Sequence, residues 1–199
     1  MNILFHIYLS GSDPELLVGN FMGDFVKGPL DDTYSPRIRE GLMLHRKIDS
    51  FAQRHPAFQT SRLRLPAYYR LYRGILVDLY YDHFLAKEWD SWSEMLFADF
   101  LANARGIIEN YLTVMPKQLQ LFVPIIFNEL LPSYESVSGI QSALERMARR
   151  VRRPNPLAEG GAELTRHYEG LKADFERFIV AAQHFTLARG DDQQDQVLL

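Results

Sequence analysis

Residues 37–54, RIREGLMLHRKIDSFAQR, decide how this sequence folds. Apolar side chains recur there at intervals of three and four residues, which is the spacing of one face of an α-helix. The residues on that face are Ile38, Leu42, His45, Ile48, Asp49 and Ala52. Because residues i and i+4 of a helix are neighbours on its surface, His45 and Asp49 project together from this face. The stretch therefore predicts a helix that offers an imidazole and a carboxylate side by side among apolar groups.

The same periodicity extends through most of the chain. Helices are expected over 67–87, 92–112, 117–131, 136–152 and 162–185. Ser93 is the expected N-cap of the second of these, and Pro124 is expected to interrupt the third, because proline lacks the amide that a helix interior needs. Proline and glycine mark 153–161 as a loop, and no alternating strand pattern is present. We expect an all-α, single-domain helical bundle over 1–185, followed by a disordered tail at 186–199.

The composition limits the available chemistry. The chain has 199 residues, of which 47% are hydrophobic, and it contains no cysteine. Disulfides, thiolate metal sites and cysteine nucleophiles are therefore excluded, and any metal must be bound by His, Asp and Glu, a donor set that suits Mn²⁺ or Mg²⁺. No stretch approaches the ~20 apolar residues that span a bilayer, and the first residues do not form a secretory signal. We expect a cytoplasmic protein that binds no membrane and, at a net charge of −3, no nucleic acid.

Further segments carry ionisable residues within apolar stretches. Asp24 lies in GNFMGDFVKG, and Asp78 and Asp82 lie in ILVDLYYDHF with His83 adjacent. A buried carboxylate costs several kcal/mol unless it is paired or binds a cation. Two helices that each offer a pair of such side chains one turn apart can bind a divalent ion between them, as helical bundles do. The pattern therefore predicts a metal site.

Salt bridges offer a simpler interpretation of each residue alone. Asp49 can pair with Arg46 or Arg54, and Asp78 with Arg73. No single scheme of ion pairs explains so many acids on apolar faces, so the metal site is the favoured hypothesis.

The remaining histidines are more ambiguous. His6, in LFHIYL, fits either a hydrogen-bonded core histidine or a residue at or next to a metal. His167 and His184 are expected to be structural or solvent-facing. No Gly-x-Ser-x-Gly sequence is present, which argues against a serine nucleophile of the α/β-hydrolase kind.

Several motifs together carry a family resemblance. The chain begins with NILFH at 2–6, followed by GNFMGDFVKG, GLMLHRKIDSFAQRHP, VDLYYDHFLAKEW and GIQSALERMARR. In that order, and with the late spacing of Tyr168, Leu171, Phe175 and Phe178, they resemble the acyl carrier protein phosphodiesterase family from residue 1 to about residue 180. The resemblance implies an all-helical, Mn²⁺-dependent relative of the HD-type phosphohydrolases. Its implied reaction is hydrolysis of the phosphodiester that joins 4′-phosphopantetheine to a serine of holo-acyl carrier protein, which yields apo carrier protein.

The resemblance also implies roles for the residues that match the family's motifs. The implied metal ligands are Asp24, His45, Asp49 and Asp78. The expected proton-transfer groups are Asp82 and His83. Arg46 or Lys27 is expected to bind the phosphoryl charge, with His6 next to the metal or substrate. Gln53 stands where members of the family can carry an Asp, so we expect it to lie outside the site.

The implied partner is a small acidic protein, so a basic surface is expected beside the site. One candidate docking surface consists of Arg146, Arg149, Arg150 and Arg153. Another consists of Arg62, Arg64, Arg70 and Arg73. Two alternatives stay open: an HD-type phosphohydrolase for a nucleotide or another small phosphodiester, and a non-catalytic helical binding module.

Overall fold

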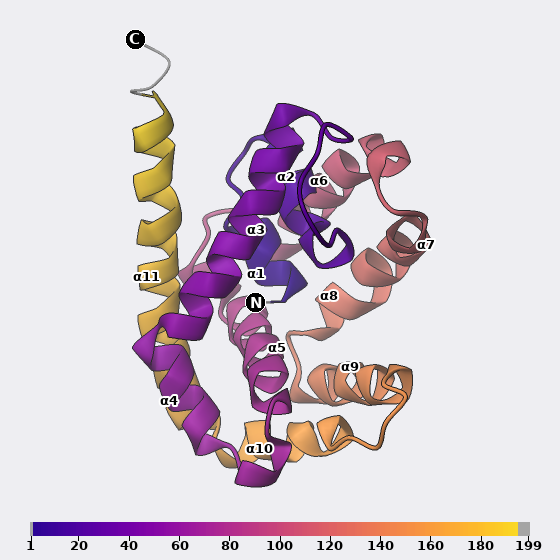
Figure 1. Cartoon of the computed structure of the whole chain (residues 1–199). Coiled ribbons are helices and arrows are strands. Elements are labelled where there is room, and N and C mark those ends of the chain that lie inside the picture. Colours follow the sequence, from indigo (N-terminus) through magenta and orange to yellow (C-terminus); the bar gives the residue numbers. More distant parts are fainter. Residues whose placement is uncertain (1, 195–199) are drawn as a thin grey trace.

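The computed structural model describes the backbone of residues 2–194 and the side chains of residues 2–188. Helices make up nearly all of the regular structure, and no strand occurs among residues 2–194 (Figure 1). The predicted all-α class is confirmed. The helices are α1 (Ile3–Tyr8), α2 (Pro14–Phe21), α3 (Pro36–Arg54), α4 (Pro56–Arg64), α5 (Tyr72–Lys87), α6 (Phe97–Asn110), α7 (Lys117–Ile125), α8 (Leu131–Ser133), α9 (Val137–Arg150), α10 (Gly160–Arg166) and α11 (Tyr168–Gln194).

Local sequence signals set where α2 and α3 begin. Asp13 accepts a hydrogen bond from the amide of Leu16 at 2.8 Å, and Ser35 accepts one from the amide of Ile38 at 3.3 Å. In both helices a proline follows the cap, where its missing amide is not needed and its fixed φ suits the first turn. These two helices therefore begin at residues that the sequence marks clearly.

Helices α2 and α3 approach each other more closely than side chains would allow. A Cβ atom on Gly19 would lie 2.1 Å from the carbonyl oxygen of Ile38, and one on Gly41 would lie 2.3 Å from the carbonyl oxygen of Leu16. The neighbouring atoms are backbone and cannot rotate away, so this contact requires glycine on both helices. The contact therefore fixes the distance between Asn20, which follows Gly19, and the turn of α3 that comes after Gly41 and contains His45.

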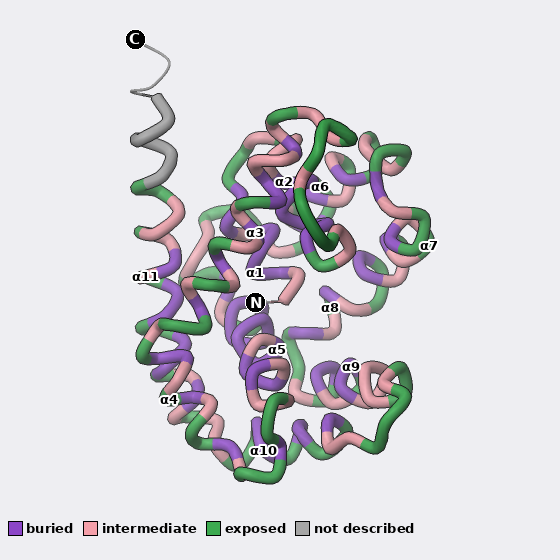
Figure 2. The backbone as a smooth tube through the Cα atoms, in the orientation of Figure 1, coloured by how far each residue is buried: buried purple, intermediate pink, exposed green. Residues whose placement is uncertain are grey.

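The short helix α1 lies at the centre of the bundle. Leu4, Phe5 and Ile7 are buried, and the ring of Phe5 packs at 5.6 Å from that of Phe178 on α11. Helix α11 runs along one side of the molecule beside α3 and α4, and the buried residues gather where α1 and α5 meet (Figures 1 and 2). Polar side chains carried by α1 are thus placed inside the core.

Some predicted boundaries are wrong. The segment expected to begin at Ser93 becomes helical only at Phe97, because Ser93 instead caps a turn by accepting from the amide of Met95 at 3.2 Å. The helix expected over 67–87 begins at Tyr72, after a turn in which Arg70 adopts a φ of 49°.

The C-terminal segment also differs from expectation. The helix expected over 162–185 is two helices, α10 and α11, separated at His167. Residues 186–194, expected in the disordered tail, continue α11, and the first of them include the good helix formers Leu187, Ala188 and Arg189. The rest of the expected tail, 195–199, lies outside the described residues. The interruption expected at Pro124 is present as a π-helical turn over Ile126–Leu130, directly after α7.

Replacing Gly41 by alanine should destabilise the protein strongly. The added methyl group would meet backbone atoms of α2, so one helix must move, and we expect a loss of about 3 kcal/mol in the free energy of unfolding. Gly106→Ala on α6 is the matched control, because a Cβ there has no neighbour within 4 Å. It should stabilise by about 0.5–1 kcal/mol. Urea unfolding of both variants measures the difference, and equal effects would contradict this account of the α2–α3 contact.

Candidate metal centre

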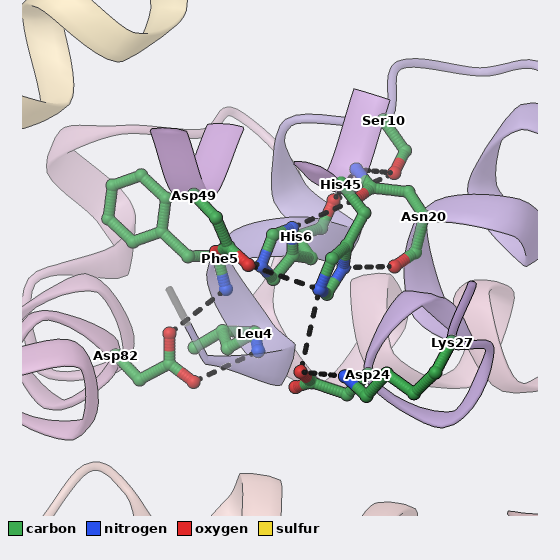
Figure 3. Close-up of polar contacts among 10 residues, drawn as sticks. All are labelled: Leu4, Phe5, His6, Ser10, Asn20, Asp24, Lys27, His45, Asp49 and Asp82. Carbon is green, nitrogen blue, oxygen red and sulfur yellow. Dashed lines mark hydrogen bonds and ion pairs between the residues drawn. The ribbon is translucent and has the colours of Figure 1, made fainter. Parts of the chain in front are cut away.

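Three side chains from α1 and α3 converge on one point. Ligand atoms of His6, His45 and Asp49 all lie within 4.8 Å of one another, so the group could hold a metal ion. The two imidazole rings stack with centroids 3.8 Å apart. The Nε2 atoms of His6 and His45 lie 3.3 and 3.4 Å from the two carboxylate oxygens of Asp49 (Figure 3). The predicted His45/Asp49 pair is thus joined by His6 from the core.

Asn20 determines how both rings are oriented. Its amide nitrogen donates to the carbonyl oxygen of His6 at 2.8 Å and to the hydroxyl of Ser10 at 2.9 Å, which points its amide oxygen at Nδ1 of His6, 2.8 Å away. Its backbone carbonyl oxygen lies 2.8 Å from Nδ1 of His45. A carbonyl oxygen only accepts, so both Nδ1 atoms carry the hydrogen and both neutral rings present a bare Nε2.

With these tautomers, unfavourable electrostatic interactions remain at the centre of the group. Two ring lone pairs face one carboxylate, and this arrangement is repulsive unless a proton or a metal ion lies between them. Burial lowers the pKa of His6 to about 4, so a proton on this ring is disfavoured at neutral pH. Among the described residues, no group forms a hydrogen bond with Nε2 of His6. Two imidazole nitrogens and a carboxylate are a donor set that a divalent cation satisfies.

The carboxyl of Asp49 favours its charged form. Burial acts to raise its pKa, but hydrogen bonding and positive charge around the carboxyl, including a proton on His6, outweigh burial and hold the pKa well below its usual range. Asp24 follows the same pattern: burial acts to raise its pKa, whereas a positive charge at Nε2 of His45, 3.6 Å away, lowers it. Both residues are therefore carboxylates at neutral pH.

A cavity of about 260 Å³ opens beside the group. Its walls bring together three of the predicted acids, Asp24, Asp49 and Asp78. Burial raises the pKa of Asp78. Gln53, which we expected outside the site, also lines this cavity, because it is one turn after Asp49 on the same face of α3. The sequence-predicted acids of α3 and α5 thus share one space.

The structure places Asp82 and His83 elsewhere. The two oxygens of Asp82 accept hydrogen bonds from the amides of Leu4 and Phe5, each at 3.0 Å, so this buried carboxyl holds the first turn of α1 (Figure 3). His83 contacts the carbonyl oxygen of Tyr134 at 2.7 Å and the hydroxyl of Tyr168 at 3.1 Å. Neither residue is among those that line the cavity.

The predicted cations lie at the edge of the site. The guanidinium of Arg46 donates to the carbonyl oxygen of Gly28 at 2.6 Å and so ties the loop after Asp24 to α3. The ammonium of Lys27 is exposed and lies 3.7 Å from Asp24. Lys27 therefore lies beside Asp24 at the entrance of the site, whereas Arg46 is hydrogen-bonded to a backbone carbonyl group.

The two candidate docking surfaces differ in how free their charges are. On α9, Arg146 pairs with Glu129 at 2.9 Å and Arg150 lies 4.5 Å from the ring centre of Phe122, while Arg149 on α9 and Arg153, three residues after its end, are exposed. In the other cluster, Arg64 is bound to the buried carboxylate of Asp174 at 2.7 Å and Arg73 donates to the carbonyl oxygen of Pro66 at 3.0 Å. Two arginines of the second surface, Arg64 and Arg73, are thus already bound within the protein.

Sequence reasoning left one positioning residue out. The positioning role of Asn20 is not predicted by the sequence analysis, although a polar amide between Val18 and Phe21 in an apolar helix is a usable signal. The choice between the two interpretations of His6 could not be made, because its contact with Asn20 joins two separate helices.

No helix among the described residues is long and apolar enough to cross a membrane.

Comparison with known proteins gives a consistent result. The sequence model of the family described as acyl carrier protein phosphodiesterase matches residues 1–182. A protein named acyl carrier protein phosphodiesterase from Yersinia enterocolitica is 31% identical over 183 residues, which are 91% of this chain and 95% of that one. Proteins of the same name from Yersinia pestis and Escherichia coli O6:H1 are 32% and 30% identical, and the alignments cover 89% of this chain and 93% of each relative. The resemblance carried by the motifs is confirmed. No solved structure matches the chain, so the expected HD-type relationship stays a prediction.

Replacing Asp82 by asparagine should make stability less dependent on pH. Burial raises the pKa of Asp82 to about 8, so the folded protein binds this proton more tightly than the unfolded chain does. The resulting stability is present in full below the usual pKa of about 4 and is lost as the pH rises toward 8. Asp82→Asn also turns an amide nitrogen toward an N–H of α1, which should cost about 1–3 kcal/mol.

Urea unfolding at pH 5, 6.5 and 8 would therefore show that the stability gap between the native protein and Asp82→Asn narrows as the pH rises. Asp90→Asn, at an exposed position, should change stability by less than about 0.5 kcal/mol at each pH. A gap that widens with pH would show instead that the two amides keep Asp82 ionised.

Proposed function

The chain belongs to the acyl carrier protein phosphodiesterase family, and from this we propose that it hydrolyses the phosphodiester that joins 4′-phosphopantetheine to a serine of holo-acyl carrier protein. The products are apo carrier protein and 4′-phosphopantetheine, and the enzyme is a phosphoric diester hydrolase. The observation that carries the proposal is the group of His6, His45 and Asp49 beside a cavity lined by further carboxylates. The absence of cysteine suits a cytoplasmic enzyme in a reducing compartment.

We assign the metal to this group. His6, His45 and Asp49 would hold the ion, with Asp24 and Asp78 offering further oxygen donors from the cavity wall. A mixed nitrogen and oxygen donor set without sulfur favours Mn²⁺, with Mg²⁺ or another divalent cation as substitutes. When bound, such an ion lowers the pKa of water and neutralises phosphoryl charge.

The chain's own residues supply the remaining functions. Asp24 is one of the two acids outside the three-residue group, and its side chain is 56% exposed, so it can reach a water molecule in the cavity when it is not bound to the ion. It would accept the proton of the attacking water and pass it to the seryl oxygen as that oxygen leaves. Lys27, beside Asp24 at the entrance, would bind a phosphoryl oxygen. Asp82 and Arg46 act by positioning α1 and the loop after Asp24, and His83 acts by joining Tyr134 to Tyr168.

The carrier protein would dock on α9. Arg149 on α9 and Arg153 just after it are exposed, and Met147 of α9 lines the cavity of the site together with Asn2. An acidic partner bound there would have its modified serine close to the metal group. Charges at such a rim mainly raise the rate of association.

Incubation with holo-acyl carrier protein and Mn²⁺ tests the activity. We expect the carrier protein to lose the mass of its 4′-phosphopantetheine, as measured by intact-protein mass spectrometry. His45→Ala removes a donor to the ion and should lower turnover at least about a hundredfold, together with Mn²⁺ affinity measured by calorimetry. His184→Ala replaces an exposed histidine of α11 and should leave both quantities unchanged.

Each alternative function predicts another result. A nucleotide or small-phosphodiester hydrolase would cleave a panel of such compounds and leave holo carrier protein intact. A binding module would form a complex with the carrier protein without any mass loss, whether or not Mn²⁺ is present. Either result would contradict the proposed reaction.

Charge reversal on α9 tests the docking surface. Arg149→Glu combined with Arg153→Glu should lower kcat/KM for holo carrier protein about tenfold at low salt, mainly through KM, because attraction to the acidic partner is lost. The loss should shrink at high salt, where exposed charges are screened. The matched pair Arg70→Glu and Arg73→Glu, from the other basic cluster, should stay within about twofold. A larger effect from the matched pair would place the partner on that cluster instead.

A further inference from the structure

A second cavity adjoins the metal centre. It has a volume of about 120 Å³ and lies between α1, α7 and α9. Asn2 and Met147 line both this cavity and the one that holds the acids, so the two spaces are neighbours. Apart from the arginines at its rim, its walls are mostly apolar, and they include Phe122, Leu130 and Ala143. An acidic, metal-binding space therefore continues directly into an apolar one.

The chemistry of the proposed substrate matches this change of character. The phosphate of 4′-phosphopantetheine is bonded to an arm whose first segment is a branched hydrocarbon with two methyl groups on one carbon. This branched segment follows the phosphate directly, whereas the amides of the arm lie farther away. A phosphate held at the carboxylate side would therefore place a compact apolar group next to it.

The size of the second cavity selects which part of the arm it accepts. A volume of 120 Å³ corresponds to about four water molecules at their share of liquid volume, which suits one branched segment but not the complete arm. Burying such a segment removes apolar surface from water, and each CH₂ group contributes about 0.8 kcal/mol. The amides and the thiol would remain outside, where water satisfies their hydrogen bonds.

The rim of the cavity carries positive charge in fixed positions. Arg146 is held by Glu129 at 2.9 Å, and Arg150 is held over the ring of Phe122. Both arginines line the second cavity and not the first. They therefore offer donors to the arm's carbonyl oxygens, or to its phosphate, on the side opposite the carboxylates.

We propose that this second cavity binds the branched apolar segment of the substrate's arm and so sets which phosphodiesters the enzyme accepts. The inference rests on the proposed function and deepens it. In the reaction the oxygen of water forms a bond to phosphorus, and the bond between phosphorus and the seryl oxygen breaks. The seryl oxygen takes the proton that the water loses. The arm stays on the phosphate, so the same cavity also binds the product 4′-phosphopantetheine.

Filling the cavity tests this inference. Ala143→Leu adds three carbon atoms to its wall, and Ala102→Leu makes the same change at an exposed position of α6, away from both cavities and from α9, as the control. The measured quantity is the ratio of kcat/KM for holo carrier protein to kcat/KM for bis(4-nitrophenyl) phosphate, a phosphodiester without the arm. We expect Ala143→Leu to lower this ratio at least about tenfold and Ala102→Leu to leave it unchanged.

Product inhibition gives a second measurement. In Ala143→Leu the inhibition constant of free 4′-phosphopantetheine should rise at least about tenfold relative to that of inorganic phosphate, which has no arm. If Ala143→Leu does not fold, Leu130→Ala removes part of the wall instead and should raise the same relative constant about fivefold. An unchanged ratio and unchanged relative inhibition in a folded variant would overturn the inference, while the proposed function would stand. A native enzyme that leaves holo carrier protein intact would overturn the proposed function itself.

Discussion

The carboxyl group of Asp82 binds the first amides of a helix that is buried on all sides, and the metal centre depends on this interaction. Helix α1 has six residues, which is too short for a helix to be stable alone in water. Its first amides lie in the core, where each one without a partner would be costly. Asp82 satisfies those of Leu4 and Phe5, and the next residue, His6, is thereby fixed in the core.

The next constraint is the glycine contact between α2 and α3, because this contact places Asn20 beside the two imidazoles. Through its side-chain oxygen and its backbone carbonyl, Asn20 binds Nδ1 of both rings. The two histidines become donors of fixed direction that face the carboxylate of Asp49. A cation between these groups attracts both ring nitrogens and the carboxylate, which would otherwise repel one another. The stability of the core and the affinity for metal are therefore linked.

The sequence was informative wherever a single helix carries the signal. The i, i+4 spacing of His45 and Asp49 predicted their shared face on α3, which contains both residues and is confirmed as helical. On helix α5 the same spacing predicted a shared face for Asp78 and Asp82, but only Asp78 lines the cavity. Nearly all residues of α5 from Leu76 onward are buried, so periodicity does not say which acid faces the cavity. An Asp in an apolar helix looks alike in sequence whether it lines the cavity, as Asp78 does, or caps another helix, as Asp82 does. The contact between His6 and Asn20 joins separate helices, so no regular sequence spacing predicts it.

The distribution of charge explains why such a site needs more than its metal to bind a phosphodiester. Asp24, Asp49 and Asp78 line one cavity, and without a cation they repel an anionic substrate. A bound divalent ion offsets part of this repulsion but offers little discrimination among phosphates. The neighbouring apolar cavity and the arginines of α9 lie on the other side of Asn2 and Met147. Because they act on the groups attached to the phosphate and not on the phosphate itself, affinity for the substrate can be high while free phosphate and simple esters bind weakly.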